Sequence, residues 1–340
     1  MSSSLRRFLI TRLLLTIPMV LILVTMIFFV MRVLPGDPIR SQLGPRVSEE
    51  QANDLRERLG LNRPLYIQYF DFLWDMVTLD FGNALTQGER PIRDELGERL
   101  PATIELTIPA ITLTAVIGIL SGAYAAKNRK KPIDYIIRLL SIAIYSIPIF
   151  FMGLLFQIFF AVRIPILPLS GRMDTLLLTQ FESVTNFYVL DAILTKNWPA
   201  LRSAITHLIM PSVTLGLALS GVFVRLTRVN MIEMLQSDFI TAGRARGIPE
   251  KRLVYKHALR NTFIPIMTLL GLQFAILLAG AVLTETTFSW PGVGRYLVDR
   301  IELRDYTAVQ ATIGIFALFV ALVSLLMDVL YAFIDPRIRY

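Results

Sequence analysis

The sequence predicts an all-α polytopic membrane protein with six transmembrane helices. Of its 340 residues, 54% are hydrophobic and only 18% are charged, whereas a soluble domain carries about 25% charged residues. Six stretches without Asp, Glu, Lys or Arg are long enough to cross a hydrocarbon core of about 30 Å as helices. In lipid every backbone polar group must bond inside the protein, and a helix achieves this within one segment. These stretches cover residues 13–31, 106–126, 139–162, 203–224, 261–284 and 306–327.

Five prolines lie inside or at the edge of these stretches. A transmembrane helix tolerates proline because neighbouring helices satisfy the carbonyl that the missing N–H leaves free. Such prolines either kink the helices for packing or act as hinges, and both interpretations stay open. They are Pro18, Pro109, Pro148, Pro211 and Pro265.

The distribution of charge predicts the orientation. The two terminal segments, the loop that follows residue 126 and the loop 225–260 together hold 18 basic and five acidic residues. The other segments, 35–101, 163–202 and 285–305, hold 15 basic and 19 acidic residues over a longer sequence. The positive-inside rule therefore places both termini in the cytoplasm of a multi-pass protein of the cell membrane, and an even number of spans agrees.

This orientation divides the chain into three parts. Residues 1–34 form a first helix with a cytoplasmic N-terminus, and 35–101 form an extracytoplasmic loop with short helices. Residues 102–340 form a five-helix core with the cytoplasmic loop 225–260 and the extracytoplasmic loop 163–202. The expected spans of the core are about 103–126, 136–162, 203–224, 261–284 and 306–334.

Several kinds of chemistry are missing from the sequence. Without Cys the chain has no disulfide, thiolate ligand or Cys nucleophile, and with only two His it offers no His-based metal cluster. No Gly-x-x-x-x-Gly-Lys motif occurs, so we expect any ATP and Mg²⁺ to be bound by another subunit. The motifs His-Glu-x-x-His and Gly-x-Ser-x-Gly are also absent, which disfavours an enzyme. The net charge of +8 follows the topology and does not indicate nucleic acid.

The first outer loop carries the pattern of a helical hairpin. Ser48 to Gln51 has capping-box spacing, Gly60 suits a helix end, and Pro64 suits the start of a second helix. This hairpin either lies on the outer membrane surface or forms part of a docking surface for an external partner. The apolar residues at helical spacing in its second half are Leu65, Tyr69, Phe72, Leu73 and Met76.

The cytoplasmic loop 225–260 predicts a short helix over residues 238–246. Ser237 is placed to cap it, and Gly247, followed by Pro249, is placed to end it. Its small residues allow close approach of another backbone, and Phe239 and Ile240 offer an apolar contact. So short a helix is marginal alone in water, so it either docks against a partner or belongs to a basic loop that only sets topology.

Two acidic residues at the margins of spans are candidates for a substrate path. Glu105 begins the second span and Asp328 lies near the inner end of the sixth. An acid inside a membrane is a functional candidate by default. We expect Asp328 to pair with Arg225 or Arg228, and Glu105 to be solvated at the outer surface.

The cytoplasmic loop resembles the EAA loop of bacterial and archaeal ABC-importer permeases, in the form found in dipeptide and oligopeptide permeases of the B type. Further matches run nearly end to end at 34–38 (LPGDP), 80–82 (DFG), 100–106 (LPATIEL), 207–211 (HLIMP), 257–261 (HALRN), 288–294 (FSWPGVG), 305–306 (DY) and 335–340 (DPRIRY). The general consensus would place Glu at Thr241, Ala at Gly243 and Leu-Pro at Leu259-Arg260, and residues 173–201 match nothing in the family. The EAA-like segment is Asp238, Phe239, Ile240, Thr241, Ala242, Gly243, Arg244, Ala245, Arg246 and Gly247.

The resemblance implies a type I importer. Such an importer combines two permeases, two ATPase subunits and an extracytoplasmic solute-binding protein. The EAA-like segment would be the coupling helix that sits in a groove of an ATPase subunit, and the substrate path would lie between the two permeases. The expected cargo is dipeptides or oligopeptides; alternatives are nickel chelates or glutathione with the same architecture, or an ion-coupled secondary carrier that works alone.

Overall fold

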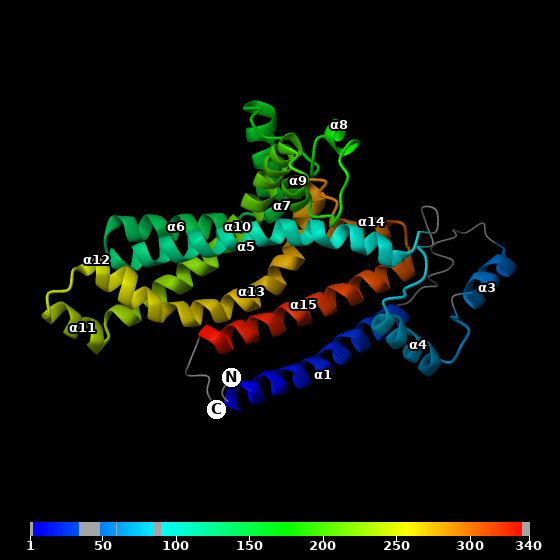
Figure 1. The fold of residues 1–340 in the computed structure, drawn as a ribbon, viewed down its shortest axis with the longest axis horizontal. Helices are drawn as coiled ribbons and strands as arrows, with labels where there is room; N and C mark the ends of the chain where they lie inside the picture. The colour runs from blue at the N-terminus through cyan, green and yellow to red at the C-terminus, as the bar shows by residue number, and fades with distance from the viewer. Residues whose placement is uncertain (1–2, 34–47, 59, 85–89, 335–340) are drawn as a thin grey trace. The chain divides into compact units, whose positions relative to one another are not determined.

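The computed structural model describes residues 3–33, 48–58, 60–84 and 90–334, and these fold almost entirely into helices (Figure 1). Apart from one isolated bridge between Asn83 and Pro91, this part of the chain has no β-structure. The all-α prediction is therefore confirmed. The matched segments 34–38 and 335–340 lie outside the described residues, as does the side chain of Asp328.

The chain divides into two compact units, which are described separately. The first contains residues 1–100 and 295–325, and the second contains 101–294 and 326–339. Helices α5, α14 and α15 contribute to both units. Their bounds are Ile92–Lys127, Val293–Glu302 and Tyr306–Ile334.

Four of the described helices are long and apolar enough to cross a membrane, and a bent pair makes a fifth if it counts as one span. The four are α5, α15, α1 (Ser3–Val33) and α10 (Trp198–Leu235). The predicted stretch 261–284 lies within α13 (Leu259–Thr287). Every predicted span is thus helical, while the number of crossings stays a prediction.

The third predicted span is not one continuous helix. Helix α6 (Pro132–Ser146) ends at Ile147, and the chain bends by 99° before α7 (Ile149–Phe156) and the π-helix η1 (Gln157–Arg163). Ile147 has an extended conformation, with φ −79° and ψ 125°. Proline disfavours the α conformation of the residue before it, so Pro148 ends α6 and starts α7. The stretch 139–162 is therefore helical on both sides of a break at Pro148, one of the prolines for which the sequence left a kink or a hinge open.

In the first unit, the two short helices expected in the first outer loop are present as α3 (Glu49–Arg58) and α4 (Leu65–Thr78). The capping box is formed, because Gln51 N donates to Ser48 Oγ and Ser48 N donates to Gln51 Oε1. Gly60 adopts a φ of +65°, and Pro64 takes the N-cap position of α4. Local sequence signals therefore set both ends of this turn.

Helix α4 packs against α1 through its aromatic residues. The Phe28 and Phe72 rings stack at 5.8 Å, and Tyr69 OH lies 2.6 Å from Thr25 Oγ1. Phe72 and Met76 are buried, as the helical spacing predicts. Leu65 is 59% exposed, because it stands at the first residue of α4, before the helix meets α1.

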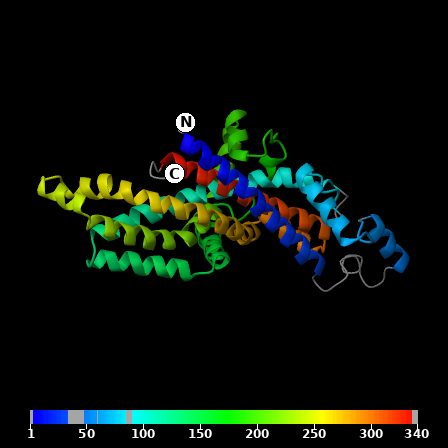
Figure 2. The same ribbon diagram turned by 90° about the horizontal axis from the view of Figure 1, so that it is seen from below.

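In the second unit, α10 lies between α6 and α13, as Figure 2 shows. Glycine allows α5 to approach α10 closely, since a Cβ on Gly216 would lie 2.8 Å from the Ala110 carbonyl oxygen. Thr114 of α5 donates its hydroxyl hydrogen to the Gly216 carbonyl at 2.9 Å. Small residues and interhelical hydrogen bonds of this kind hold helices together in lipid, where the hydrophobic effect does not.

The stretch 173–201, in which the sequence shows no family motif, is folded. It contains the short helices α8 (Thr175–Leu178) and α9 (Tyr188–Leu194), and a small apolar cluster joins Met173 and Ala192 to the start of α10. The Asp191 carboxylate accepts hydrogen bonds from Ser183, Val184 and Thr185. Burial raises the pKa of Asp191, but these hydrogen bonds outweigh it and the net pKa is lowered.

Candidate functional site

The short helix expected in the cytoplasmic loop is present as α11 (Asp238–Ala245). It follows α10 and lies at the end of the second unit opposite α9 (Figure 1). Gly247 has a φ of +74°, the left-handed conformation that glycine adopts without strain, and Pro249 follows. The helix ends one residue earlier than expected, with Arg246 at the C-cap position.

Ser237 stands at the N-cap position of α11, but its hydroxyl does not cap the helix. It donates instead to the Met234 carbonyl at 2.6 Å, which belongs to the last turn of α10. The hydroxyl therefore stabilises the turn between the two helices. The side-chain cap expected from the sequence was wrong, because the end of α10 offers a nearer partner.

One face of α11 is buried against its own chain. Ile240 is fully buried with Met231, and with Leu253 and Val254 of the π-helix η2 (Leu253–Ala258). A Cβ on Gly243 would lie 2.7 Å from Leu253 Cδ2. The close approach that Gly243 allows is thus to η2 of this chain, and Ile240 is not free for an external contact.

The opposite face of α11 is exposed. Phe239 is 45% exposed, and Arg244 forms a surface ion pair with Glu250 of α12 (Glu250–Arg252) at 2.8 Å. The hydrogen bond from Arg244 lowers the pKa of Glu250. A rigid helix therefore presents an aromatic ring, small residues and positive charge outward. The exposed residues are Asp238, Phe239, Thr241, Ala242, Arg244, Ala245 and Arg246.

A buried ion pair joins α6 and α10 beside this loop. Arg228 Nε donates to Asp134 Oδ1 at 2.6 Å, and Nη2 donates to Oδ2 at 2.7 Å. The Asp134 side chain is only 2% exposed, and the hydrogen bond from Arg228 lowers its pKa. Among the described residues the partner of Arg228 is thus Asp134, in the first turn of α6, which offers a bidentate contact. The expected pairing of Asp328 with Arg225 or Arg228 stays a prediction, because the Asp328 side chain lies outside the described residues.

Glu105, the other candidate, is buried and not solvated. It is 8% exposed, and its Oε2 accepts hydrogen bonds from Arg172 Nε at 2.9 Å and from Nη2 at 2.5 Å. Its Oε1 accepts from the Val189 backbone N–H at 2.7 Å. The Arg172 guanidinium stacks on the Tyr188 ring, 3.8 Å from its centroid. The folded loop 163–202 therefore covers Glu105, and both carboxylate oxygens serve to anchor that loop to α5.

Glu105 also borders an apolar groove of about 820 Å³ between α5, α9 and α10. Most of its lining is aliphatic, for example Ile108, Leu208 and Ile209. The buried Ser212 hydroxyl lines the groove and has no hydrogen-bond partner in the described part of the chain. The groove is chemically suited to apolar side chains and offers few polar contacts.

Two of the matched sequence segments pack together in a cluster that site reasoning from the sequence missed. Trp290 Nε1 donates to the Ala102 carbonyl at 2.9 Å, and Val293 N donates to Thr103 Oγ1 at 2.9 Å. Thr103 Oγ1 in turn donates to Glu285 Oε1 at 2.6 Å. The sequence feature that could have indicated this contact is the pair of motifs at 100–106 and 288–294. Groups of the second motif donate hydrogen bonds that groups of the first accept.

The glycines of the second motif are required by this contact. A side chain at Gly292 would collide with the Glu285 carboxylate, and a Cβ on Gly294 would lie 2.7 Å from Val282 Cα. Glu285 and Thr103 are fully buried, and Trp290 is 1% exposed. The cluster thus fixes the end of α13 to α5 within the second unit.

Comparison with known proteins places this architecture in a family. Residues 101–340 match the model described as binding-protein-dependent transport system inner membrane component, and residues 5–107 match the model of its N-terminal part. The chain belongs to this family. Its members are membrane permeases, so the type I ABC permease fold expected from the resemblance is confirmed.

Similar proteins cover nearly the whole chain. The dipeptide transport system permease protein of Alkalihalophilus pseudofirmus is 39% identical over 97% of this chain and 98% of its own length. The di/tripeptide transport system permease protein of Pseudomonas aeruginosa is 40% identical over 92% and 93%. The glutathione transport system permease protein of Escherichia coli K12 is 36% identical over 98% and 99%. The family match and these relatives support a permease and not a catalytic subunit.

Proposed function

We propose that this chain is the permease subunit of an ATP-driven importer of dipeptides and forms half of the translocation path. The similarity to dipeptide permeases over nearly the full length carries this proposal. The ATP-binding motif missing from the sequence would be supplied by separate ATPase subunits with their Mg²⁺. A second permease subunit and an extracytoplasmic solute-binding protein complete the assembly.

We infer that α11 is the element through which ATPase movement reaches the membrane helices. Its exposed face supplies Phe239 and two arginines to a partner, while Ile240 and Gly243 join it rigidly to η2 and α10. A rigid connection is needed because the ATPase has no covalent tie to the spans. The coupling residues proposed from the sequence thus separate into a partner-facing set and a supporting set.

The proposed topology supports this role. Six spans with both termini in the cytoplasm of a multi-pass inner-membrane protein put α11 on the ATPase side. The hairpin of α3 and α4 would then face the extracytoplasmic binding protein. The ion pair between Arg228 and Asp134 holds α10 to α6 just where α10 leaves the membrane toward α11.

Reconstitution tests the function. We expect the chain, its second permease and the ATPase subunits in proteoliposomes to take up radiolabelled dipeptide only when ATP and the binding protein are both present. Glutathione and a nickel chelate are offered in parallel. Preferred uptake of glutathione or nickel would contradict the dipeptide assignment, and uptake by this chain alone would favour a secondary carrier.

A further inference from the structure

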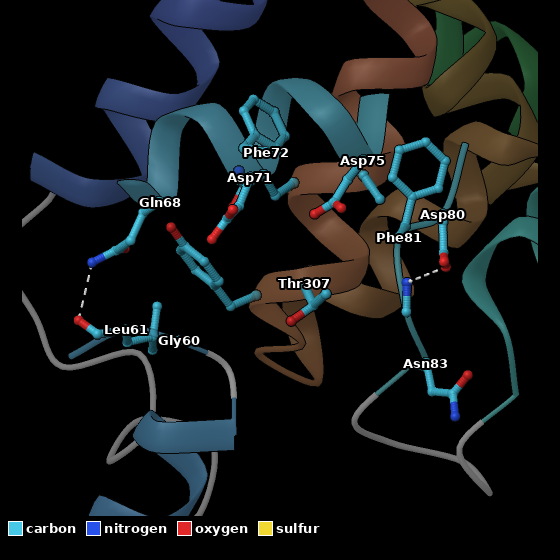
Figure 3. Close-up of a pocket in the computed structure, with 14 residues that line it drawn as sticks. Gly60, Leu61, Gln68, Asp71, Phe72, Asp75, Asp80, Phe81, Asn83 and Thr307 are labelled. Carbon is cyan, nitrogen blue, oxygen red and sulfur yellow. Dashed lines mark hydrogen bonds between the residues drawn. The ribbon is translucent and has the colours of Figure 1, made fainter. Parts of the chain in front are cut away.

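The first unit contains a pocket of about 390 Å³, lined by both polar and aromatic side chains, that none of the roles above uses. Helix α4, the segment that follows it and the start of α15 line this pocket, as Figure 3 shows. Figure 3 also shows Asp71 and Asp75 extending from the same side of α4, the side on which Thr307 lies. On the proposed topology the pocket lies on the extracytoplasmic side.

The pocket carries an excess of negative charge. Asp71, Asp75 and Asp80 line it, and none of the described residues that line it is Lys, Arg or His. Asp71 contacts Arg63 at 3.1 Å, but both side chains are more than half exposed, so this ion pair is weak. Burial raises the pKa of Asp75, and the charges of Asp71 and Asp80 raise it further.

A second observation, at Gln68 in the pocket wall, indicates that a ligand with a hydrogen-bond donor would fit here. Its side-chain nitrogen donates to the Leu61 and Arg63 carbonyls at 3.1 and 2.7 Å, which fixes the orientation of the amide. Its Oε1 is buried and accepts no hydrogen bond from any residue that the structure describes, and Gln68 as a whole is only 8% exposed. A buried acceptor without a donor costs about 1–3 kcal/mol, so a ligand that donates there gains this energy back.

The geometry favours an organic cation over a metal ion. Among the described side chains no three His, Asp or Glu are gathered closely enough to hold a metal. Phe72 and Phe81 line the pocket beside the carboxylates. An alkyl chain that ends in a guanidinium or ammonium group matches both features, since its stem contacts aromatic surface and its head donates several hydrogen bonds.

We propose that this pocket, formed around Asp75, Asp80 and Gln68, receives a Lys or Arg side chain of the extracytoplasmic solute-binding protein when that protein docks. A free peptide fits less well, because it would bring its own carboxylate close to three aspartates, with only the exposed Arg63 beside Asp71 to balance the charge. A protein side chain brings the positive charge alone. This inference rests on the proposed function, which supplies the partner.

The test measures docking of the binding protein to the full transporter in nanodiscs. The variant Asp75→Asn/Asp80→Asn keeps shape and retains an oxygen that accepts from Gly82 N, as Asp80 does at 3.4 Å. We expect its Kd for the binding protein to rise at least about tenfold, which is about 1.4 kcal/mol, since the docked cation loses its charged partners. Glu182→Gln, which removes an exposed carboxylate from the loop 163–202, outside both the pocket and the α3–α4 segment, is the matched control with an unchanged Kd.

Two further readouts separate the outcomes. Wild-type docking should weaken with added salt and with propylguanidine as a competitor, and the double variant should lose both responses. If the wild type docks and imports but the double variant docks equally well, this inference is overturned while the proposed function stands. Propylguanidine binding that depends on Asp75 and Asp80 without any effect on docking would overturn the assignment to a protein side chain. If even the wild type neither docks the binding protein nor imports dipeptide, the proposed function itself fails.

Discussion

At the scale of single residues, Gly243 belongs to the segment proposed to bind the ATPase, but its small size is required for packing within this chain. A larger side chain there meets Leu253, and overpacking of this kind costs about 1–3 kcal/mol. We expect Gly243→Leu to lower the thermal stability of the purified subunit. Ala242→Leu, on the exposed face of the same helix, should keep that stability and weaken ATPase association. Equal stability of the two variants would contradict the packing of α11 on η2.

The ion pair between Asp134 and Arg228 predicts a pH dependence. Because the folded-state pKa of Asp134 is lowered from its ordinary value of 3.8, the pair stabilises the fold above that pH. The contribution is lost as the pH falls through the lowered pKa. We expect Asp134→Asn to lower the free energy of unfolding at pH 7 by up to about 3 kcal/mol. The variant should therefore unfold at a lower temperature than the wild type. The stability difference between Asp134→Asn and the wild type should narrow below pH about 4. Asp238→Asn, at an exposed site, should be as stable as the wild type at both pH values.

At the scale of elements, the break at Pro148 is the clearest case in which a span departs from a simple rod. Replacing Pro148 by Ala restores an N–H donor and frees Ile147 to become helical. We expect spin labels at 139 and 155 in Pro148→Ala to show longer distances than in the wild type, because α6 and α7 align. Pro132→Ala at the start of α6, where proline is compatible with a helix, is the control. An unchanged distance distribution in Pro148→Ala would show that tertiary packing, and not proline, sets the bend.

The elements also show what sequence reasoning could reach. Capping chemistry at Ser48 and the left-handed Gly247 are local signals, so they predicted α3 and α11 within a residue or two. The burial of Glu105 could not be predicted, because its partner Arg172 is 67 residues away in a loop without recognisable motif. The same holds for the acidic pocket at Asp75. The Glu285 cluster joins two motifs that the sequence does show, although the sequence does not show that they contact each other. Each depends on tertiary contacts between segments whose spacing in the sequence carries no periodic signal.

At the scale of the whole molecule, the proposed orientation places α11 and the α3–α4 hairpin on opposite sides of the membrane. The absence of Cys makes this directly testable, since any introduced thiol is the only one in the chain. We expect Phe239→Cys, on the exposed face of α11, to react with a membrane-impermeant maleimide only in inside-out vesicles. Glu50→Cys, exposed on α3, should react only in right-side-out vesicles or intact cells.

The pair of thiols tests the topology because a wrong number of spans between them would place both on the same side of the membrane. An odd number of spans between them, as the positive-inside rule requires, puts them on opposite sides. If the bent α6–α7 segment re-entered the membrane without crossing it, both thiols would lie on the same side and react in the same vesicles. In that case the pocket around Asp75 and Asp80 and helix α11 would face the same compartment. The binding protein and the ATPase could not then act on this chain from opposite faces, and the proposed coupling would fail with the topology.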